Sequence, residues 1–175
     1  MISLRRVGRE DAARLCAIWS GDRLPGYSLP ADAAQMEALI KEWNRDNGCG
    51  RRFYMLLIEA DGMPAGLISL FEKEDGASMG ISVHPSFQRR GIGAGAVLLA
   101  EAFAGGFPWK RLTSECRADN AASIALHEKC GFCRTGERIN RKGNRVICWE
   151  KALKDEKEKV PHGKLGGDSS PMSLT

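Results

Sequence analysis

Short stretches in which apolar and polar residues alternate recur along the chain, and a period of two residues predicts β-strands. The turn dipeptides Asp61-Gly62 and Asp75-Gly76 and the tripeptide Lys142-Gly143-Asn144 separate neighbouring stretches, as expected for hairpins. Strands are predicted at residues 2–7, 53–59, 64–72, 77–83, 111–117, 134–140 and 145–151.

Other stretches repeat their apolar residues every three to four positions, which predicts helices. The clearest spans residues 31–43, where Met36, Leu39, Ile40 and Trp43 follow the helical spacing. Further helices are predicted at 9–19, 93–104 and 120–129, the last with Asp119 or Asn120 as its cap. The Gly- and Pro-containing residues 21–30 read as a loop, and residues 47–50 end the second helix.

The predicted order of elements is β-α-α-β-β-β-α-β-α-β-β. Strands two to four are joined by hairpin turns and therefore pair antiparallel, which excludes a doubly wound Rossmann sheet. We expect an α+β fold with a mixed, mostly antiparallel sheet flanked by helices. Residues 1–153 form one domain, and the polar residues 154–175 cannot bury enough apolar surface to order themselves, so we expect a mobile tail.

Composition narrows the class of protein. The 175 residues are 43% apolar and 27% charged, which is ordinary for a globular domain, and no apolar run reaches the ~18 residues of a membrane span. The N-terminus has no signal-peptide pattern, so a cytoplasmic location is expected. A net charge of +4 and scattered aromatic residues do not predict nucleic-acid binding.

Six cysteines lie inside predicted strands, helices and their turns, where we expect reduced, mostly buried side chains. Cys130 and Cys133 form a C-x-x-C pair, but a structural zinc ion needs a second pair of ligands at suitable spacing. The sequence offers none and contains only three histidines, so no metal is predicted.

A glycine-rich elbow joins the strand at 77–83 to the helix at 93–104. It reads Gln88-Arg89-Arg90-Gly91-Ile92-Gly93-Ala94. Glycine lets the backbone bend and approach a ligand closely, and the helix start presents free N–H groups with a positive dipole end behind them. Two arginines add charge, so the predicted ligand is a pyrophosphate, although the spacing is neither G-x-G-x-x-G nor a P-loop and is weak evidence alone.

The elbow resembles the Gln/Arg-x-x-Gly-x-Gly/Ala loop with which the GNAT superfamily of N-acyltransferases binds acetyl-coenzyme A. About thirty residues later, residues 120–132 resemble the second motif of that superfamily, Asn-x-x-Ser/Ala-x-x-Leu-Tyr-x-Lys-x-Gly-Phe, with His127 at the tyrosine position. Two motifs in the right order make the resemblance specific, and it covers roughly residues 1–152. It implies the GNAT fold and acetyl transfer from acetyl-coenzyme A directly to an amine in a ternary complex.

The resemblance also assigns roles to the coenzyme site. The elbow N–H groups from Arg89 to Ala94 would hold the pyrophosphate, while main-chain N–H groups of Ile81, Ser82 and Val83 would polarise the thioester carbonyl. In the family this strand splays from its parallel neighbour, and the pantetheine arm completes the sheet there. Asn120, besides capping its helix, and Ser123 one turn later would contact the coenzyme.

Glu115 is the candidate general base. It lies in the predicted strand 111–117, where desolvation by neighbouring core residues would raise the pKa of its carboxyl. Its surroundings also resemble the Glu-x-Arg-x-x-Asn run of GNAT enzymes that acetylate protein N-termini, in which this glutamate is the base. The alternative is a solvated glutamate paired with a residue such as Arg117; Glu72 and Glu74 are weaker candidates for the base.

His127 is the candidate general acid, since in the family the tyrosine here protonates the departing thiolate. A neutral imidazole still carries one N–H to donate. The alternatives are a helix-surface histidine that only packs, and water as the acid. Arg134, Arg138, Arg141 and Arg145 read as a solvated hairpin face, with an acidic-substrate grip as the other possibility.

The acceptor amine stays open: a small molecule, a lysine or a protein N-terminus all fit, and the protein could be a monomer or a homodimer. Trp19, Tyr27 and Trp43 could line the acceptor pocket, although core packing is the simpler role for both tryptophans. The rival function is a non-catalytic coenzyme A-binding module that regulates. Proton-carrying groups at positions 115 and 127 favour the enzyme.

Overall fold

The computed structural model describes residues 1–45, 51–153 and 172–174. The predicted helix-ending turn at 47–50 and most of the predicted tail, residues 154–171 and 175, lie outside the described residues. The elements are β1 (Ile2–Arg6), η1 (Arg9–Asp11), α1 (Ala12–Trp19), β2 (Gly21–Leu24), β3 (Tyr27–Leu29), α2 (Ala33–Trp43), β4 (Phe53–Ala60), β5 (Met63–Glu72), β6 (Gly76–Val83), η2 (Pro85–Phe87), α3 (Ile92–Ala104), β7 (Arg111–Arg117), α4 (Ala121–Lys129), β8 (Cys133–Ile139), β9 (Arg145–Ala152) and β10 (Met172–Leu174).

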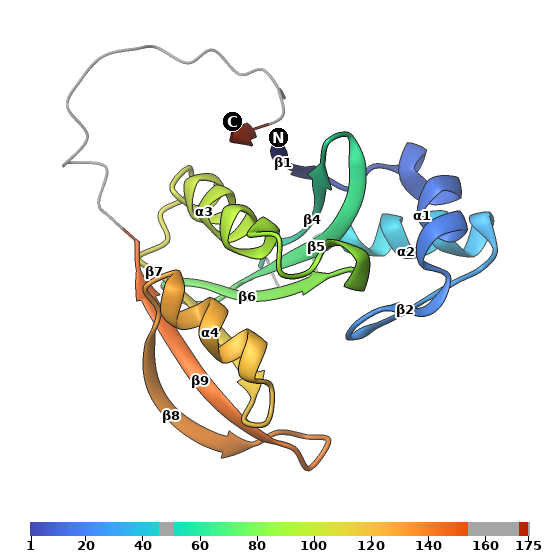
Figure 1. The fold of residues 1–175 in the computed structure, drawn as a ribbon. Helices are drawn as coiled ribbons and strands as arrows, with labels where there is room; N and C mark the ends of the chain where they lie inside the picture. The colour runs from blue at the N-terminus through green and yellow to red at the C-terminus, as the bar shows by residue number, and fades with distance from the viewer. Residues whose placement is uncertain (46–50, 154–171, 175) are drawn as a thin grey trace.

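Eight of these strands form one sheet in the order β10-β1-β4-β5-β6-β7-β9-β8 (Figure 1). Every neighbouring pair is antiparallel except β6 and β7, which are parallel and joined through η2 and α3. The predicted α+β architecture with a mixed, mostly antiparallel sheet is therefore confirmed. The predicted turn at Asp61-Gly62 has left-handed backbone at both residues, as a tight hairpin requires.

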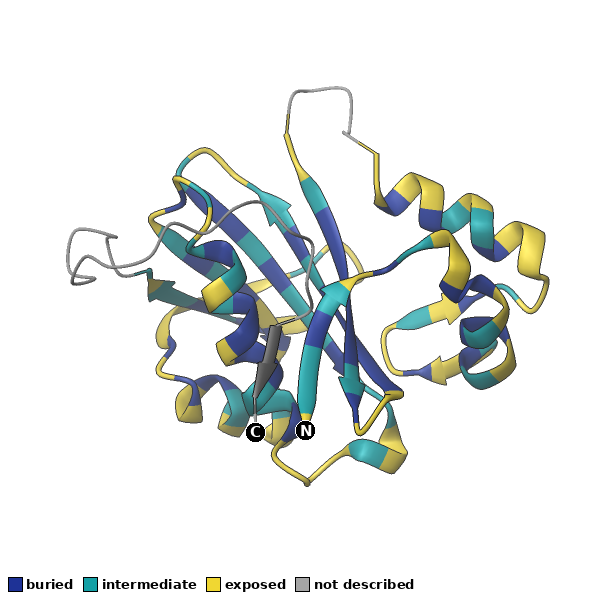
Figure 2. Ribbon diagram, turned by 90° about the horizontal axis from the view of Figure 1, so that it is seen from above, coloured by how far each residue is buried: buried dark blue, intermediate teal, exposed yellow. Residues whose placement is uncertain are grey.

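Two apolar cores lie on opposite faces of this sheet. On β4, Leu56 and Ile58 belong to the cluster that contains α3, whereas Met55 and Leu57 belong to the cluster that contains α1 and α2. Alternation along a strand explains the division, because successive side chains point to opposite faces. Figure 2 shows buried segments running through the strands between the helices of the two faces. We call these the α3/α4 face and the α1/α2 face.

The parallel pair β6–β7 separates part-way along its length. Its register runs from Gly76 opposite Arg111 to Met79 opposite Ser114 and goes no further. The rest of β6 stays paired with β5, and the rest of β7 stays paired with β9. The sheet therefore contains a gap between residues 80–83 and residues 115–117, open toward the elbow that starts α3.

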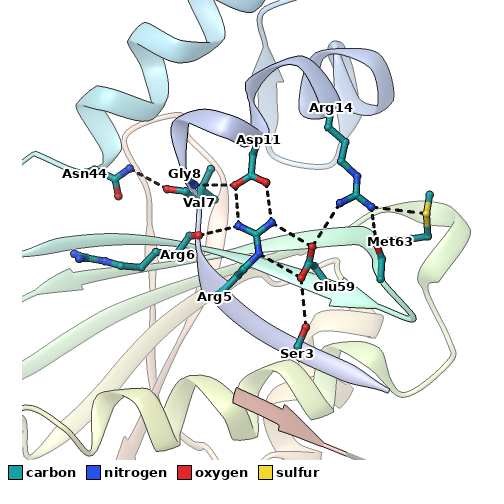
Figure 3. Close-up of polar contacts among 11 residues, drawn as sticks. Ser3, Arg5, Arg6, Val7, Gly8, Asp11, Arg14, Asn44, Glu59 and Met63 are labelled. Atoms are coloured by element: carbon teal, nitrogen blue, oxygen red, sulfur yellow. Dashed lines mark hydrogen bonds and ion pairs between the residues drawn. The ribbon is translucent and has the colours of Figure 1, made fainter. Parts of the chain in front are cut away.

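A polar network fixes the start of α1 against the sheet (Figure 3). Arg5 on β1 donates to both carboxylate oxygens of Asp11, at 2.9 and 2.7 Å, and also to Glu59 on β4. Asp11 is only 5% exposed and accepts a further hydrogen bond from the Gly8 N–H at 2.8 Å. Because a buried carboxylate is costly without partners, this network specifies where the first helix leaves β1.

Residues 21–30, predicted as a loop, form the small two-stranded sheet of β2 and β3, so that prediction is wrong. Gly26 in their connection has φ +82°, and Ser82 on β6 donates a hydrogen bond from its hydroxyl to the Pro25 carbonyl. The tertiary hydrogen bond holds this hairpin over the α1/α2 face. Within the predicted tail, Met172–Leu174 form β10 antiparallel to β1.

Candidate functional site

The gap between β6 and β7 exposes particular main-chain groups. At the two ends of the β5–β6 pair, His84 N–H donates to the Ala65 carbonyl and Lys73 N–H donates to the Gly76 carbonyl, both at 2.8 Å. The register between these bonds is uninterrupted, so even-numbered residues of β6 bond to β5 and odd-numbered ones face β7. Ile81 and Val83 therefore direct their N–H and C=O groups into the gap.

The strand geometry does not place Ser82 with the predicted carbonyl-polarising groups. Its main-chain groups face β5, because it is an even-numbered residue of β6. Its buried hydroxyl is used in the bond to Pro25. Ser82 thus supports the β2–β3 hairpin, whereas the main-chain groups of Ile81 and Val83 face the gap.

The elbow has the backbone of an anion site. Arg89 and Gly91 both have positive φ, +60° and +76°, and Gly91 is the N-cap of α3 with no side-chain cap. The first hydrogen bond within the helix runs from Gly95 N–H to the Gly91 carbonyl at 3.0 Å. The N–H groups of Ile92, Gly93 and Ala94 lie before it, in the first turn, where helical N–H groups have no intrahelical acceptor.

The side chains of the elbow divide into two roles. Gln88 turns back and donates from its amide nitrogen to the Val83 carbonyl at 2.9 Å, which fixes the elbow to the open end of the gap. Arg89 and Arg90 are exposed, and the Arg90 guanidinium lies 5.5 Å from the Phe87 ring centre. The arginines are therefore available to phosphates, while Gln88 acts on the protein itself.

The start of α4 is capped as the sequence predicts. The Asn120 side-chain oxygen accepts a hydrogen bond from Ser123 N–H at 3.0 Å. Asn120 is exposed and Ser123 is half-buried, so both remain reachable from the α3/α4 face. The Ser123 carbonyl has a further use, because it accepts a hydrogen bond from the ring of His127 at 2.7 Å.

His127 is buried, only 2% exposed, and is not the helix-surface residue of the packing alternative. Its ring stacks on Trp149 with centroids 5.2 Å apart and meets Phe132 edge-on at 5.4 Å. Burial lowers the pKa of His127, while the hydrogen bond to the Ser123 carbonyl acts in the opposite direction. The imidazole is therefore held in its neutral form at pH 7.

Both ring nitrogens of His127 have partners. A carbonyl oxygen can only accept, so the ring proton lies on Nδ1, and Nε2 accepts from the Ser114 hydroxyl 2.8 Å away. The expectation that neutral His127 has an N–H free to donate to a thiolate is thus not met by this geometry. The hydroxyl of Ser114 is the hydrogen-bond donor at the end of this chain.

Glu115 lies in a different environment from the one that the sequence predicts. Its side chain is 40% exposed, so it is not desolvated by the core. Both carboxylate oxygens accept hydrogen bonds from Arg138 on β8, each at 2.8 Å. Arg117, named as the alternative partner, instead pairs with Asp119.

Glu115 and His127 lie on opposite faces of the sheet. Leu112 and Cys116 belong to the core under α3, so the even-numbered side chains of β7 point to the α3/α4 face together with Ser114. Glu115 points to the α1/α2 face. A thioester lying in the gap between β6 and β7 would have one group on each side of the sheet.

The other candidate residues lie away from the gap or in the core. Glu72 and Glu74 lie near the start of β6, the end at which β6 and β7 remain paired, and Glu72 accepts hydrogen bonds from Arg52 N–H and Trp109. Trp19 and Trp43 are buried in the core under α1 and α2, and Tyr27 is half-buried.

The hairpin arginines divide between the two faces. Arg134 and Arg145 pair with Glu137, while Arg138 reaches Glu115. Of the C-x-x-C pair, Cys130 is buried as expected and Cys133 is exposed. In the described ranges, no group of three or more His, Cys, Asp or Glu side chains is placed to hold a metal ion.

Sequence reasoning missed Ser114 and Arg138 as parts of the site. Ser114 alternates with Glu115 in one strand, and a serine at a position that should face the core was the available signal. Arg138 was grouped with the hairpin arginines. Its pairing with Glu115 depends on the register between β7, β9 and β8, which cannot be read from a single sequence.

The chain matches the family model described as acetyltransferase (GNAT) domain over residues 2–133. The chain belongs to the GNAT acetyltransferase family. The motif resemblance is thereby confirmed at the level of the family. A search of curated protein sequences gives no significant match.

Solved structures of GNAT enzymes share the fold at low sequence identity. The ribosomal L7/L12 α-N-protein acetyltransferase RimL in complex with coenzyme A is 18% identical, with a TM-score of 0.74, covering 87% of this chain and 94% of its own. The ribosomal-protein-S18-alanine N-acetyltransferase from Escherichia coli is 21% identical, with a TM-score of 0.66 and coverages of 93% and 100%. The spermidine/spermine N-acetyltransferase SpeG from Vibrio cholerae is 19% identical, with a TM-score of 0.67 and coverages of 87% and 95%.

These identities establish a common fold and leave the acceptor open. Structures in this set include complexes with coenzyme A and with acetyl-coenzyme A. No helix in the described part of this GNAT chain is long and apolar enough to cross a membrane.

Proposed function

We propose that this GNAT protein is an N-acetyltransferase that moves an acetyl group from acetyl-coenzyme A directly to an amine within a ternary complex. The observation that carries the proposal is the gap between β6 and β7, which opens beside the first turn of α3. An unpaired strand edge can accept an amide-containing arm as a substitute strand, and a helix start can accept phosphate.

The roles follow from position. N–H groups from Arg89 to Ala94 hold the pyrophosphate, and Arg89 and Arg90 add charge from solvent-exposed side chains. The N–H groups of Ile81 and Val83 face the gap and polarise the thioester carbonyl, the group on which negative charge develops during attack. Asn120 and Ser123 border the arm at the start of α4.

The amine approaches from the α1/α2 face, on which Glu115 lies. Glu115 is the general base of the proposal, and it becomes available when Arg138 releases at least one of its oxygens. The pair is exposed on both sides, and such surface pairs contribute only ~0–1 kcal/mol, so opening it is a small part of the barrier.

We further propose an acceptor with a single reactive amine, such as a protein N-terminus, over a polyamine like the substrates named for SpeG. A polycation requires an excess of carboxylates. On this face Glu115 pairs with Arg138 and Asp119 pairs with Arg117, so negative charge is matched by arginine. The N-terminal acetyltransferases among the structural neighbours make the first class the natural starting point.

The rival, a non-catalytic coenzyme A-binding regulator, gains support from one observation. Arg138 occupies both oxygens of Glu115, and a permanently paired carboxylate cannot accept a proton from an amine. An enzyme requires this pair to exchange with the acceptor, whereas a binding module does not.

Thiol release from acetyl-coenzyme A, measured with a panel of N-terminal peptides, lysine peptides, polyamines and small amines, distinguishes the two. The enzyme releases thiol in proportion to an acetylated amine identified by mass spectrometry, and neutral N-terminal peptides react faster than polyamines. Calorimetric binding of coenzyme A without turnover of any amine supports the regulator. Absence of coenzyme A binding refutes both.

A further inference from the structure

Ser114 lies where the gap between β6 and β7 closes. It is the last residue of β7 in register with β6, opposite Met79. Its side chain is 3% exposed and points to the α3/α4 face, the side from which an arm held by the elbow would enter the gap. An arm that followed the gap to its closed end would come next to Ser114.

The hydroxyl is held by a chain of three hydrogen-bonding groups. The Ser123 carbonyl fixes the proton of His127 on Nδ1, and this leaves Nε2 as an acceptor for Ser114. Stacking of His127 on Trp149 fixes the plane of the ring. Because every group in this chain is buried or half-buried, the position of the Ser114 oxygen is set by the protein and not by solvent.

The His127 ring and the Ser114 hydroxyl together reach about as far as a tyrosine side chain. Standard bond lengths place a tyrosine hydroxyl roughly 5.7 Å from its Cβ, and the extended path from the His127 Cβ to Nε2 and on to the Ser114 oxygen is roughly 6.4 Å, so the two reaches are similar. The second part of that path is the 2.8 Å hydrogen bond. Histidine alone is too short, and the serine supplies the missing hydroxyl.

We propose that Ser114 contacts the sulfur of the coenzyme and donates a hydrogen bond to the leaving thiolate, with His127 as its positioning residue. This inference rests on the proposed function. Before reaction the hydroxyl proton points to Nε2 of His127. As the carbon–sulfur bond breaks and charge builds on sulfur, the hydroxyl rotates toward the anion, because charge-assisted hydrogen bonds are stronger than neutral ones.

No proton leaves Ser114 or His127 in this step. The amine forms the new carbon–nitrogen bond and loses one proton, and the thiolate finally gains one proton, so the reaction balances without a charged histidine. The buried, neutral imidazole suits this arrangement, since it accepts a hydrogen bond without having to become cationic.

The test measures the ionisation of coenzyme A bound to the protein, which requires no acceptor amine. The ultraviolet absorbance of the thiolate is followed against pH for coenzyme A bound to the wild type and to variants. Ser114→Ala should reduce the bound thiolate fraction roughly tenfold at a given pH, as expected for the loss of a hydrogen bond to a charged group. Ser114→Thr, which keeps the hydroxyl, should retain most of it.

Ser78→Ala is the matched control, because Ser78 lies on β6 within the paired segment and its side chain points to the α1/α2 face. It should leave the thiolate fraction unchanged. Equal thiolate fractions for wild type and Ser114→Ala would overturn the proposal. If wild-type protein does not bind coenzyme A at all, it is the proposed function that fails, and Ser114 is not the cause.

A measurement on the wild type alone covers the case in which Ser114→Ala does not fold. Nitrogen-15 NMR of the His127 ring should show the Nδ1–H tautomer, and formation of the bound thiolate should shift Nε2 as it loses its donor. Desulfo-coenzyme A should cause no such pH-dependent shift. A shift of equal size with both ligands would overturn the proposal.

Discussion

Replacing Gly91 by alanine separates coenzyme binding from folding. Gly91 has φ +76°, and a Cβ built there meets no atom within 4 Å. The variant therefore costs only the left-handed backbone strain of a non-glycine residue, ~1–2 kcal/mol, which a domain with typical stability of ~5–15 kcal/mol survives. The new methyl group lies at the N-cap of α3, where the pyrophosphate should approach, so we expect affinity for coenzyme A to fall about tenfold or more.

One glycine supplies the control. Gly143 has φ +79° and equally open space around its Cβ, but it lies in the β8–β9 turn, so Gly143→Ala should lose the same stability and keep full affinity. Urea unfolding and calorimetric titration with coenzyme A measure both quantities. Wild-type affinity in folded Gly91→Ala would refute pyrophosphate binding at the elbow.

Two further changes test the base and the N-terminal network. Glu115→Gln should lower turnover by roughly 10²-fold with little effect on coenzyme affinity, and a pH–rate profile that keeps its acidic limb would assign the base elsewhere. Burial raises the pKa of Asp11, but hydrogen bonds from Arg5 and Gly8 N–H outweigh it and hold that pKa below its usual value. The stabilisation by Asp11 is thus complete above the unfolded-state pKa of ~4 and is lost as pH falls through the folded pKa. Asp11→Asn should be ~1–3 kcal/mol less stable at neutral pH, and its free energy of unfolding in urea should fall less steeply toward acid pH.

The elbow and the α4 cap could be predicted because their information is local. Glycine at position 91 supplies the positive φ that the turn needs, and Asn120 caps a helix whose first residues follow directly. The face on which Glu115 lies also follows from alternation within one strand.

Its environment did not follow, because burial depends on which distant segments cover that face. The carboxylate of Glu115 meets Arg138, 23 residues away on β8, instead of core side chains. In the same way, residues 21–30 contain turn-forming Pro and Gly, yet the hydroxyl of Ser82 holds them as a hairpin. The residue type determines which hydrogen bonds or charges a side chain can offer, while the tertiary structure determines which partners it meets.

For His127, the sequence predicted the residue and its helix but not its tautomer. The tautomer depends on the Ser123 carbonyl one turn earlier and on Ser114 across the strand. Only the second of these contacts is tertiary, and it is the first, local one that fixes the proton on Nδ1 and leaves Nε2 as an acceptor.

The gap between β6 and β7 also has a mechanical consequence. Four register pairs at one end join the five strands from β10 to β6 to the three strands β7, β9 and β8. These four pairs are the main-chain connection between the two groups of strands, so they limit how far the groups can move apart. A pantetheine arm bound between the two groups would hold them together and slow hydrogen exchange at the amides of Ile81 and Val83. Each release of product would return the sheet to its more compliant state.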